Sequence, residues 1–277
     1  MKRSSMHTAA LLLVPTLFVV GFFVTPLLYA VGLSFGLPDF TIANYRHLAD
    51  SAVYRLVYLK TLKVALITTL ACLLLGYPTA YFMSRLSTKA RATAIMFVAL
   101  PFMLSVLVRN YVWMTMLQDT GFINRLLMNL GITDAPVRLM YNELGVLIAM
   151  VNMLVPYVIF PVLTSLMAIP PNLKTASASL GADRLSTFLR ITLPLTAAGT
   201  AAGCLLTFII ALGFYITPAM LGGPNEMMIS SLIAFNVREV LNWPFAFSLA
   251  TTLLGSTVVL YLAYRAVAPR AVAMKPV

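Results

Sequence analysis

The feature that most restricts how this chain can fold is a series of long apolar runs separated by polar segments. A helix needs about 20 apolar residues, each rising about 1.5 Å, to cross the hydrocarbon core of a bilayer. Six runs meet this length, near residues 9–33, 64–84, 92–113, 146–168, 195–216 and 245–264. The composition, 61% hydrophobic and 10% charged, excludes an ordinary soluble domain. We therefore expect an all-α polytopic membrane protein, with residues 1–277 forming one membrane domain of six transmembrane helices.

The distribution of charge predicts which side of the membrane each loop occupies. An even number of spans puts both termini on one side, and loops rich in Lys and Arg stay in the cytoplasm. With the termini inside, the inner side holds eleven of the 19 Lys and Arg but only Asp183 of the 8 acids. These cations are Lys2, Arg3, Arg85, Lys89, Arg91, Lys174, Arg184, Arg190, Arg265, Arg270 and Lys275. Membrane orientation and anionic lipid then explain the net charge of +11 without any nucleic acid.

The polar segment 169–194 interrupts the apolar runs and predicts a helical hairpin. Gly181 would end a first short helix in a left-handed conformation, and Asp183 would cap a second one. Apolar faces are expected at Leu173, Ala176 and Leu180 in the first helix and at Leu185, Phe188 and Leu189 in the second. A hairpin this short is not stable alone in water. These faces must therefore pack on the membrane domain or on a soluble partner.

The sequence lacks the motifs that would make this chain an enzyme. It contains no GxxxxGK[ST] phosphate loop, no HExxH, no GxSxG and no pair of carboxylates inside a span. Two Cys and two His, none at ligand spacing, predict no metal site. Intramembrane enzymes and ion-coupled carriers place ionisable groups at hydrocarbon depth. The spans of this chain lack such groups, which indicates a transport path that is opened by another component.

The spacing within segment 169–194 resembles the EAA loop of binding-protein-dependent ABC importer permeases. In that family Glu-Ala-Ala is followed by three residues and Gly, then by nine residues and Ile-x-Leu-Pro. Here Thr-Ala-Ser at 175–177 takes the EAA positions, Gly181 and Ile191 follow at those intervals, and Leu193-Pro194 comes next. Other stretches are similar to first permease components of the spermidine/putrescine type. They are residues 44–48, 73–85, 107–127, 216–224 and 242–248.

The resemblance implies a type I ABC importer permease fold with a cytoplasmic coupling helix in the bacterial inner membrane. It also implies a second permease, two ATPase subunits that carry the ATP and Mg, and an extracytoplasmic solute-binding protein. This chain would hold no cofactor of its own. The residues expected to meet the ATPase are Lys174, Thr175, Ala176, Ser177, Leu180, Gly181, Ala182, Asp183 and Phe188.

One departure from the family pattern concerns the charge of the hairpin. The family glutamate meets a basic residue of the ATPase, whereas this chain has Thr175 at that position. Either a second permease supplies the carboxylate, or Asp183 and Lys174 provide the charge matching. The loss favours a heterodimer of permeases over a homodimer.

The substrate path is expected near the outer mouth, where acids and aromatic rings could bind an amine. Candidates are Tyr111, Trp113, Asp119, Asn152, Tyr215 and Glu226. The alternative is that these aromatic residues anchor the protein at the interface, that the acids are solvated, and that Asn152 bonds another helix.

Several functions remain open at this point. Within the importer class, the solute could be a polyamine, an opine or amino-acid-like compound, an organophosphonate or ferric iron. A self-sufficient secondary transporter is a further alternative.

Overall fold

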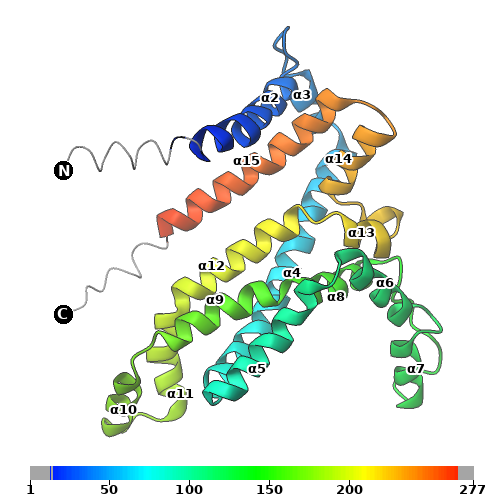
Figure 1. Ribbon diagram of the computed structural model, residues 1–277. Coiled ribbons are helices and arrows are strands. Elements are labelled where there is room, and N and C mark those ends of the chain that lie inside the picture. Colours follow the sequence, from blue (N-terminus) through cyan, green and yellow to red (C-terminus); the bar gives the residue numbers. More distant parts are fainter. Residues whose placement is uncertain (1–12, 14, 268–277) are drawn as a thin grey trace, which may run out of the picture. The chain divides into compact units, whose positions relative to one another are not determined.

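The structure of this protein is a computed structural model that describes residue 13 and residues 15–267. These residues are helical, without strands (Figure 1). In chain order the elements are η1 (Val20–Val24), α2 (Thr25–Ser34), α3 (Ala43–Asp50), α4 (Ala52–Ser84), α5 (Thr88–Ala99), η2 (Leu100–Met103), α6 (Val106–Leu117), α7 (Phe122–Asn129), α8 (Glu143–Leu154), α9 (Pro156–Met167), α10 (Pro171–Ser179), α11 (Arg184–Thr187), η3 (Phe188–Thr192), α12 (Leu193–Leu212), α13 (Ile216–Leu221), η4 (Pro224–Glu226), α14 (Ile229–Arg238) and α15 (Trp243–Val267).

Five helical stretches are long and apolar enough to cross a membrane. They cover Pro15–Ser34, Ala52–Ser84, Glu143–Met167, Arg184–Leu212 and Trp243–Ala266. A sixth candidate consists of two parts, Thr88–Met103 and Val106–Asn129, which are bent by 96° at the break between them. The expectation of an all-helical membrane protein is confirmed, with five or six candidate spans.

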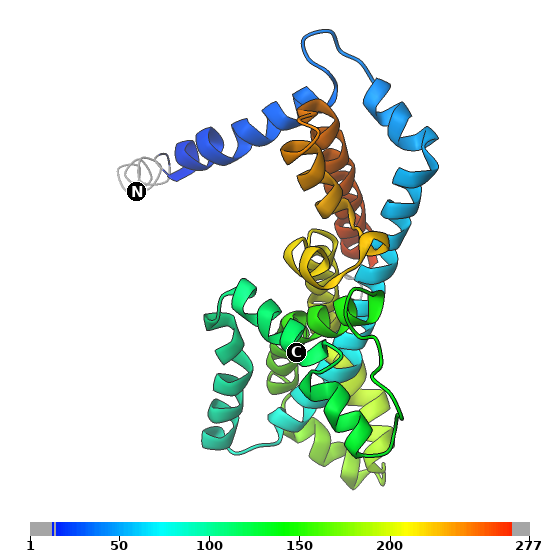
Figure 2. The same cartoon turned by 90° about the vertical axis from the view of Figure 1, so that its right-hand side faces the viewer.

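The run near 92–113, expected as one crossing, is divided in the structure. Pro101 lies in the 3₁₀ turn η2, and Leu104 and Ser105 behind it are extended, with ψ angles of 141° and 137°. A proline cannot donate a backbone hydrogen bond, and the two extended residues end the helical ladder. Figure 2 shows the resulting turn between α5 and α6. Hydropathy alone does not reveal such a break.

The run near 195–216 begins earlier than hydropathy indicates. α11, the π-helical segment η3 and α12 follow one another without a loop from Arg184 to Leu212. Proline removes one backbone hydrogen bond and crowds the carbonyl four residues before it. For Pro194 that carbonyl belongs to Arg190, inside η3, and a wider π turn accommodates the mismatch. The hairpin therefore continues directly into the helix that follows it.

The chain forms two compact units. Unit 1 comprises residues up to 56 and Leu232–Ser256, and unit 2 comprises Val57–Ser231 and residues from 257 on. In unit 1, the ring of His47 lies 5.3 Å from that of Tyr54 and 5.4 Å from that of Phe245. His47 thus takes part in an aromatic cluster that joins α3 to α15.

Within unit 2, α9 and α12 run side by side (Figure 1). A Cβ atom on Gly199 would lie 1.9 Å from Oγ of Ser165, and one on Gly203 would lie 3.2 Å from the carbonyl oxygen of Tyr157. Small residues four positions apart allow helices to approach closely in a membrane. This packing holds the two helices that enter and leave the hairpin.

Candidate functional site

The hairpin expected between residues 169 and 194 is present, and its local structure is confirmed. Gly181 has a φ of +77°, in the left-handed region. The N–H groups of Leu180 and Ala182 donate to the carbonyl oxygens of Ala176 and Ser177, each over 3.1 Å. A Cβ atom at Gly181 would meet nothing within 4 Å. The backbone conformation, and not crowding within this chain, therefore favours glycine here.

Asp183 caps the second helix of the hairpin, as expected. Its Oδ1 accepts a hydrogen bond from the N–H of Ser186 over 3.1 Å. Hydrogen bonds from the Ser186 side chain and backbone hold the pKa of the exposed Asp183 carboxyl below its usual value. Asp183 is thus ionised at neutral pH and directs its charge at the start of α11.

The two arms of the hairpin are tied together by hydroxyl groups. The Ser177 and Thr187 hydroxyl oxygens are 2.8 Å apart, joining α10 to α11. The Thr175 hydroxyl donates to the carbonyl oxygen of Pro171 over 3.4 Å. At the position where the family has a glutamate, this chain therefore carries a neutral side chain that bonds its own helix.

The apolar faces expected on the hairpin divide into an exposed part and a packed part. Leu180 is 88% exposed, and Leu173, Leu185 and Leu189 are exposed as well. Phe188 instead packs edge-on against two rings of α4, Tyr77 and Tyr81, with centroids 6.0 and 5.4 Å away. Of the face expected at Leu185, Phe188 and Leu189, Phe188 thus packs within the chain, whereas the two leucines stay exposed.

Five of the nine expected coupling residues line a cavity of about 370 Å³ in the hairpin. Ser177, Leu180, Gly181, Ala182 and Asp183 line it, with Ser186, Arg190 and Ile191. Thr175 and Ala176 are exposed on α10. The side chain of Lys174 lies outside those that the structure describes.

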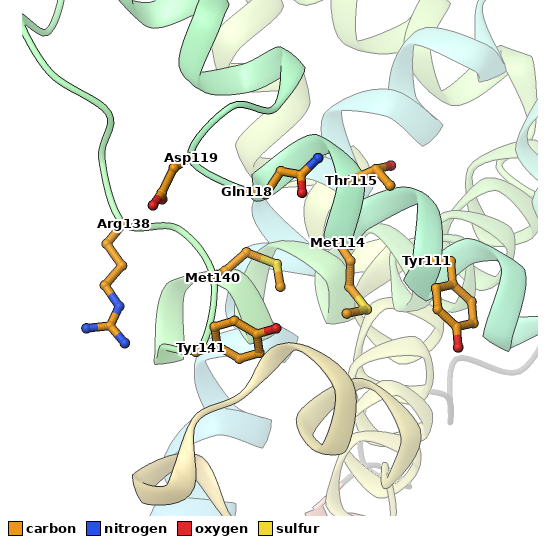
Figure 3. A pocket seen from close by; sticks show the side chains of 8 residues that line it. All are labelled: Tyr111, Met114, Thr115, Gln118, Asp119, Arg138, Met140 and Tyr141. Atoms are coloured by element: carbon orange, nitrogen blue, oxygen red, sulfur yellow. The ribbon is translucent and has the colours of Figure 1, made fainter.

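At the other end of unit 2, residues of α6 and of the segment before α8 line a cavity of about 640 Å³ (Figure 3), which we call the outer cavity after the side of the membrane expected from the sequence. Two expected substrate-path residues line it, Tyr111 and Asp119. Sequence reasoning missed its other members, which are Met114, Thr115, Gln118, Arg138, Met140 and Tyr141. Among the described residues, no cation lies within 4.0 Å of the Asp119 carboxylate. The cavity thus combines aromatic rings and thioethers with one acid and one base.

Asn124 connects the two chain segments that border this cavity. Its side chain is fully buried, and its Oδ1 accepts from the N–H of Val137 over 2.8 Å. Its Nδ2 donates to the carbonyl oxygens of Val137 and Gln118, over 3.0 and 3.2 Å. Asn124 therefore positions Gln118 and, next to Val137, Arg138.

The other four substrate-path candidates do not join this cavity. The Trp113 indole donates to Oδ1 of Asn152 over 3.1 Å, so this pair links α6 to α8. Glu226 forms an ion pair with Lys60 over 2.9 Å. Tyr215 is half-buried at the start of α13. The six candidates therefore do not make one site.

Two further polar contacts were not found from the sequence. Lys63 pairs with Glu143 over 2.6 Å. The Thr217 hydroxyl donates to Oδ1 of Asn110 over 2.8 Å, with both side chains fully buried. The signal for Asn110 was available, since an amide inside an apolar run must find a partner on another helix.

The helices, the hairpin and the outer cavity define a class of protein: a multi-pass membrane subunit for transport. Residues 69–272 match the family described as "Binding-protein-dependent transport system inner membrane component". The chain belongs to this family of non-catalytic ABC importer permeases.

Curated relatives and solved structures agree with this assignment. The chain is 36% identical over 239 residues to the spermidine/putrescine transport system permease protein PotB of Escherichia coli K12, covering 86% of each chain. It is 33% identical over 261 residues to PotB of Salmonella typhimurium SL1344, covering 91% of each. The crystal structure of a bacterial ABC transporter that imports the acidic polysaccharide alginate has a chain with a TM-score of 0.77 to this one. Those two chains are 18% identical, with 99% of this chain and 98% of that chain covered.

These findings confirm the resemblance, the type I importer permease fold and the multi-pass inner-membrane location. They also exclude the self-sufficient secondary transporter that remained open from the sequence.

Proposed function

We propose that this permease moves a polyamine or a related small amine across the inner membrane, with residues 1–277 acting as one permease domain. The observation that carries the substrate is the outer cavity, where no cation of the described chain lies within 4.0 Å of the Asp119 carboxylate and where Tyr111 and Tyr141 line the walls. Ammonium groups bind to carboxylates and to aromatic faces. The relatives named for spermidine and putrescine support the same class of solute.

The test is uptake of labelled putrescine and spermidine by the complete transporter in cells that lack other uptake routes. Loss of one charged hydrogen bond at Asp119→Asn is expected to raise KM by about tenfold. Asp134→Asn is the matched control, because Asp134 is an exposed acid outside the cavity. Unchanged uptake of both amines by Asp119→Asn would exclude this residue from the path.

A second candidate substrate is an amino-acid-like zwitterion. Arg138 lines the same cavity as Asp119, so a solute with both an ammonium and a carboxylate would find a partner for each. Binding assays on the partner solute-binding protein with amines and with zwitterions distinguish the two candidates. If Arg138→Gln takes up amines as the wild type does, and neither protein transports a zwitterion, the polyamine is favoured.

For the hairpin, we infer that it is the coupling element that meets an ATPase subunit on the cytoplasmic side. The exposed Leu180 and Leu185 and the turn at Gly181 supply an apolar surface of the kind a partner groove covers. Two ATPase subunits would bind ATP and Mg, a second permease would complete the pathway, and both termini would be cytoplasmic. Closure of the ATPase pair would move the hairpin and expose the path alternately to each side.

A further inference from the structure

A small cavity of about 210 Å³ lies at the root of the hairpin, where its returning arm meets the last turn of α4. Figure 1 shows α10 and α11 at this end of unit 2. Two arginines, Arg85 directly after α4 and Arg184 of α11, contribute to its lining. The other lining residues are Tyr81, Ala182, Thr187, Phe188 and Thr192.

The guanidinium groups at this cavity have no acidic partner in the described chain. Within residues 15–267, no carboxylate lies within 4.0 Å of Arg85 or Arg184. The acid nearest in sequence, Asp183, is engaged by the N–H of Ser186. Uncompensated guanidinium groups that share a cavity favour an anion.

Arg85 is held in place at the cavity wall. Its Cζ atom lies 4.3 Å from the centre of the Tyr81 ring, and its Nη2 donates to the Tyr81 hydroxyl. Phe188 packs edge-on against the same ring. The cation is therefore pre-oriented by an aromatic stack, which lowers the entropy lost when it binds a ligand.

Large apolar side chains near the cavity are exposed on the surface of the chain. Phe82, the neighbour of Tyr81, is 65% exposed, and Leu189 and Leu193 on the arm that leads into α12 are 50% and 40% exposed. The run Arg184–Leu212 is itself long and apolar enough to cross a bilayer. A ligand with a charged head and hydrocarbon chains fits this arrangement better than a free anion does.

We propose that this cavity binds the phosphate group of an anionic phospholipid, with Arg85 and Arg184 as its ligands and Phe82 and Leu189 beside the acyl chains. Guanidinium groups bind phosphate through two parallel charge-assisted hydrogen bonds. Basic pockets at the cytoplasmic ends of membrane helices attract anionic headgroups. This assignment rests on the proposed cytoplasmic position of the hairpin. The bound lipid fixes the root of the hairpin to the membrane surface.

The test uses the complete transporter in nanodiscs of phosphatidylcholine with a minor share of phosphatidylglycerol. Native mass spectrometry measures the phosphatidylglycerol that remains bound after release into detergent. Arg85→Gln and Arg184→Gln are each expected to reduce retention about fivefold, and the double variant more. Arg91→Gln is the matched control: Arg91 is a cation of the same expected side that does not line the cavity. It should retain lipid as the wild type does.

Three further results decide the assignment. Arg85→Lys keeps the charge without the bidentate geometry, so intermediate retention supports the site and also shows that the folded protein tolerates change at residue 85. Equal retention in the wild type and the double variant, or equal loss in Arg91→Gln, overturns it. Stabilisation of the transporter by inorganic phosphate in pure phosphatidylcholine, with no preference for phosphatidylglycerol, would assign the cavity to a soluble anion instead. ATPase activity and uptake, measured in parallel, test the coupling proposal separately.

Discussion

The two ends of unit 2 handle charge in opposite ways. At the end that holds the outer cavity, Lys60 and Lys63 of α4 form ion pairs with Glu226 and Glu143, respectively. At the hairpin end, Arg85, Arg184 and Arg190 have no carboxylate within 4.0 Å in the part of the chain that the structure describes. The two lysines at the first end are therefore paired within the chain. The three arginines at the hairpin end have no such partner among the described residues.

This difference also appears in apolar surface and in backbone. Gly222 and Gly223, at the outer end, allow close packing, since a Cβ atom on either would lie within 2.6 Å of a backbone oxygen. Gly181 in the hairpin has open space around it, and Leu180 beside it is almost fully exposed. The outer end is closely packed within the chain, whereas the hairpin turn leaves apolar surface exposed.

The largest expected effect comes from a substitution at the hairpin turn, where the two ends differ most in exposed apolar surface. Gly181→Asp keeps the fold, because Asp tolerates the left-handed region and no atom of this chain obstructs it. A charged side chain in the partner interface is expected to lower uptake by about tenfold or more while ATP hydrolysis continues. Uptake and ATPase activity are measured together in reconstituted transporter.

The control for this prediction is Gly131→Asp. Gly131 has a φ of +68° and equally open space, but it lies in the segment that follows α7. Its substitution should leave uptake unchanged. Equal loss of uptake in both variants would mean that the turn conformation, and not the hairpin surface, causes the defect.

The next effect compares the two ion pairs of the outer end. The Lys60 and Glu226 side chains are 24% and 16% exposed, whereas those of Lys63 and Glu143 are 57% and 26% exposed. Glu226→Ala leaves a half-buried cation and should reduce the free energy of unfolding by about 1–3 kcal/mol. Glu143→Ala should reduce it by about 0.2–1 kcal/mol. Thermal unfolding of the purified protein, read as Tm, provides the ranking, and a reversed order would contradict it.

A smaller effect tests whether Asn124 positions the residues that line the outer cavity. Asn124→Leu removes the clamp on Gln118 and Val137, and each lost hydrogen bond is worth about 1 kcal/mol. We expect KM for the transported solute to rise about fivefold with kcat little changed. Asn129→Leu, at an exposed position of the same helix, is the control. A fall in kcat without a change in KM would argue against a positioning role.

The smallest effect concerns the cap of the hairpin. Because hydrogen bonds lower the pKa of Asp183 in the folded protein, its stabilising contribution is present above the unfolded pKa and is lost as pH falls through the lower, folded value. The protection of the Ser186 amide, measured as its hydrogen-exchange rate relative to the intrinsic rate at each pH, should therefore fall at acid pH. Asn also caps helices but does not titrate, so Asp183→Asn should abolish this pH dependence. A loss of protection that persists in Asp183→Asn would assign it to another group.

Local signals predicted the hairpin well. Gly181 and Asp183 were placed correctly because a left-handed stop and a helix cap depend on single residues and their immediate neighbours. That Phe188 packs on Tyr81 of α4, and that a π-helical segment begins at this residue, were not predicted. A periodicity of 3.6 residues cannot describe a π turn.

The outer cavity shows where prediction from sequence ends. Tyr111 and Asp119 were selected as single residues of suitable chemistry, and both line this cavity. Arg138 and Tyr141 come from a segment beyond α7, and nothing in the sequence pattern brings that segment back to α6. The buried amide of Asn124 makes this connection through three hydrogen bonds.

The sequence by itself determined that this protein is an all-helical membrane protein with a polar hairpin, because hydropathy and caps act over at most a few turns of chain, and its resemblance to importer permeases supplied the class. The tertiary structure decided which lysines meet which glutamates, where the span near 92–113 breaks, and which arginines stay unpaired among the described residues. The pairing of charges depends on contacts between residues as far as 166 positions apart, such as Lys60 and Glu226. Packing in three dimensions, and no local pattern, selects such partners.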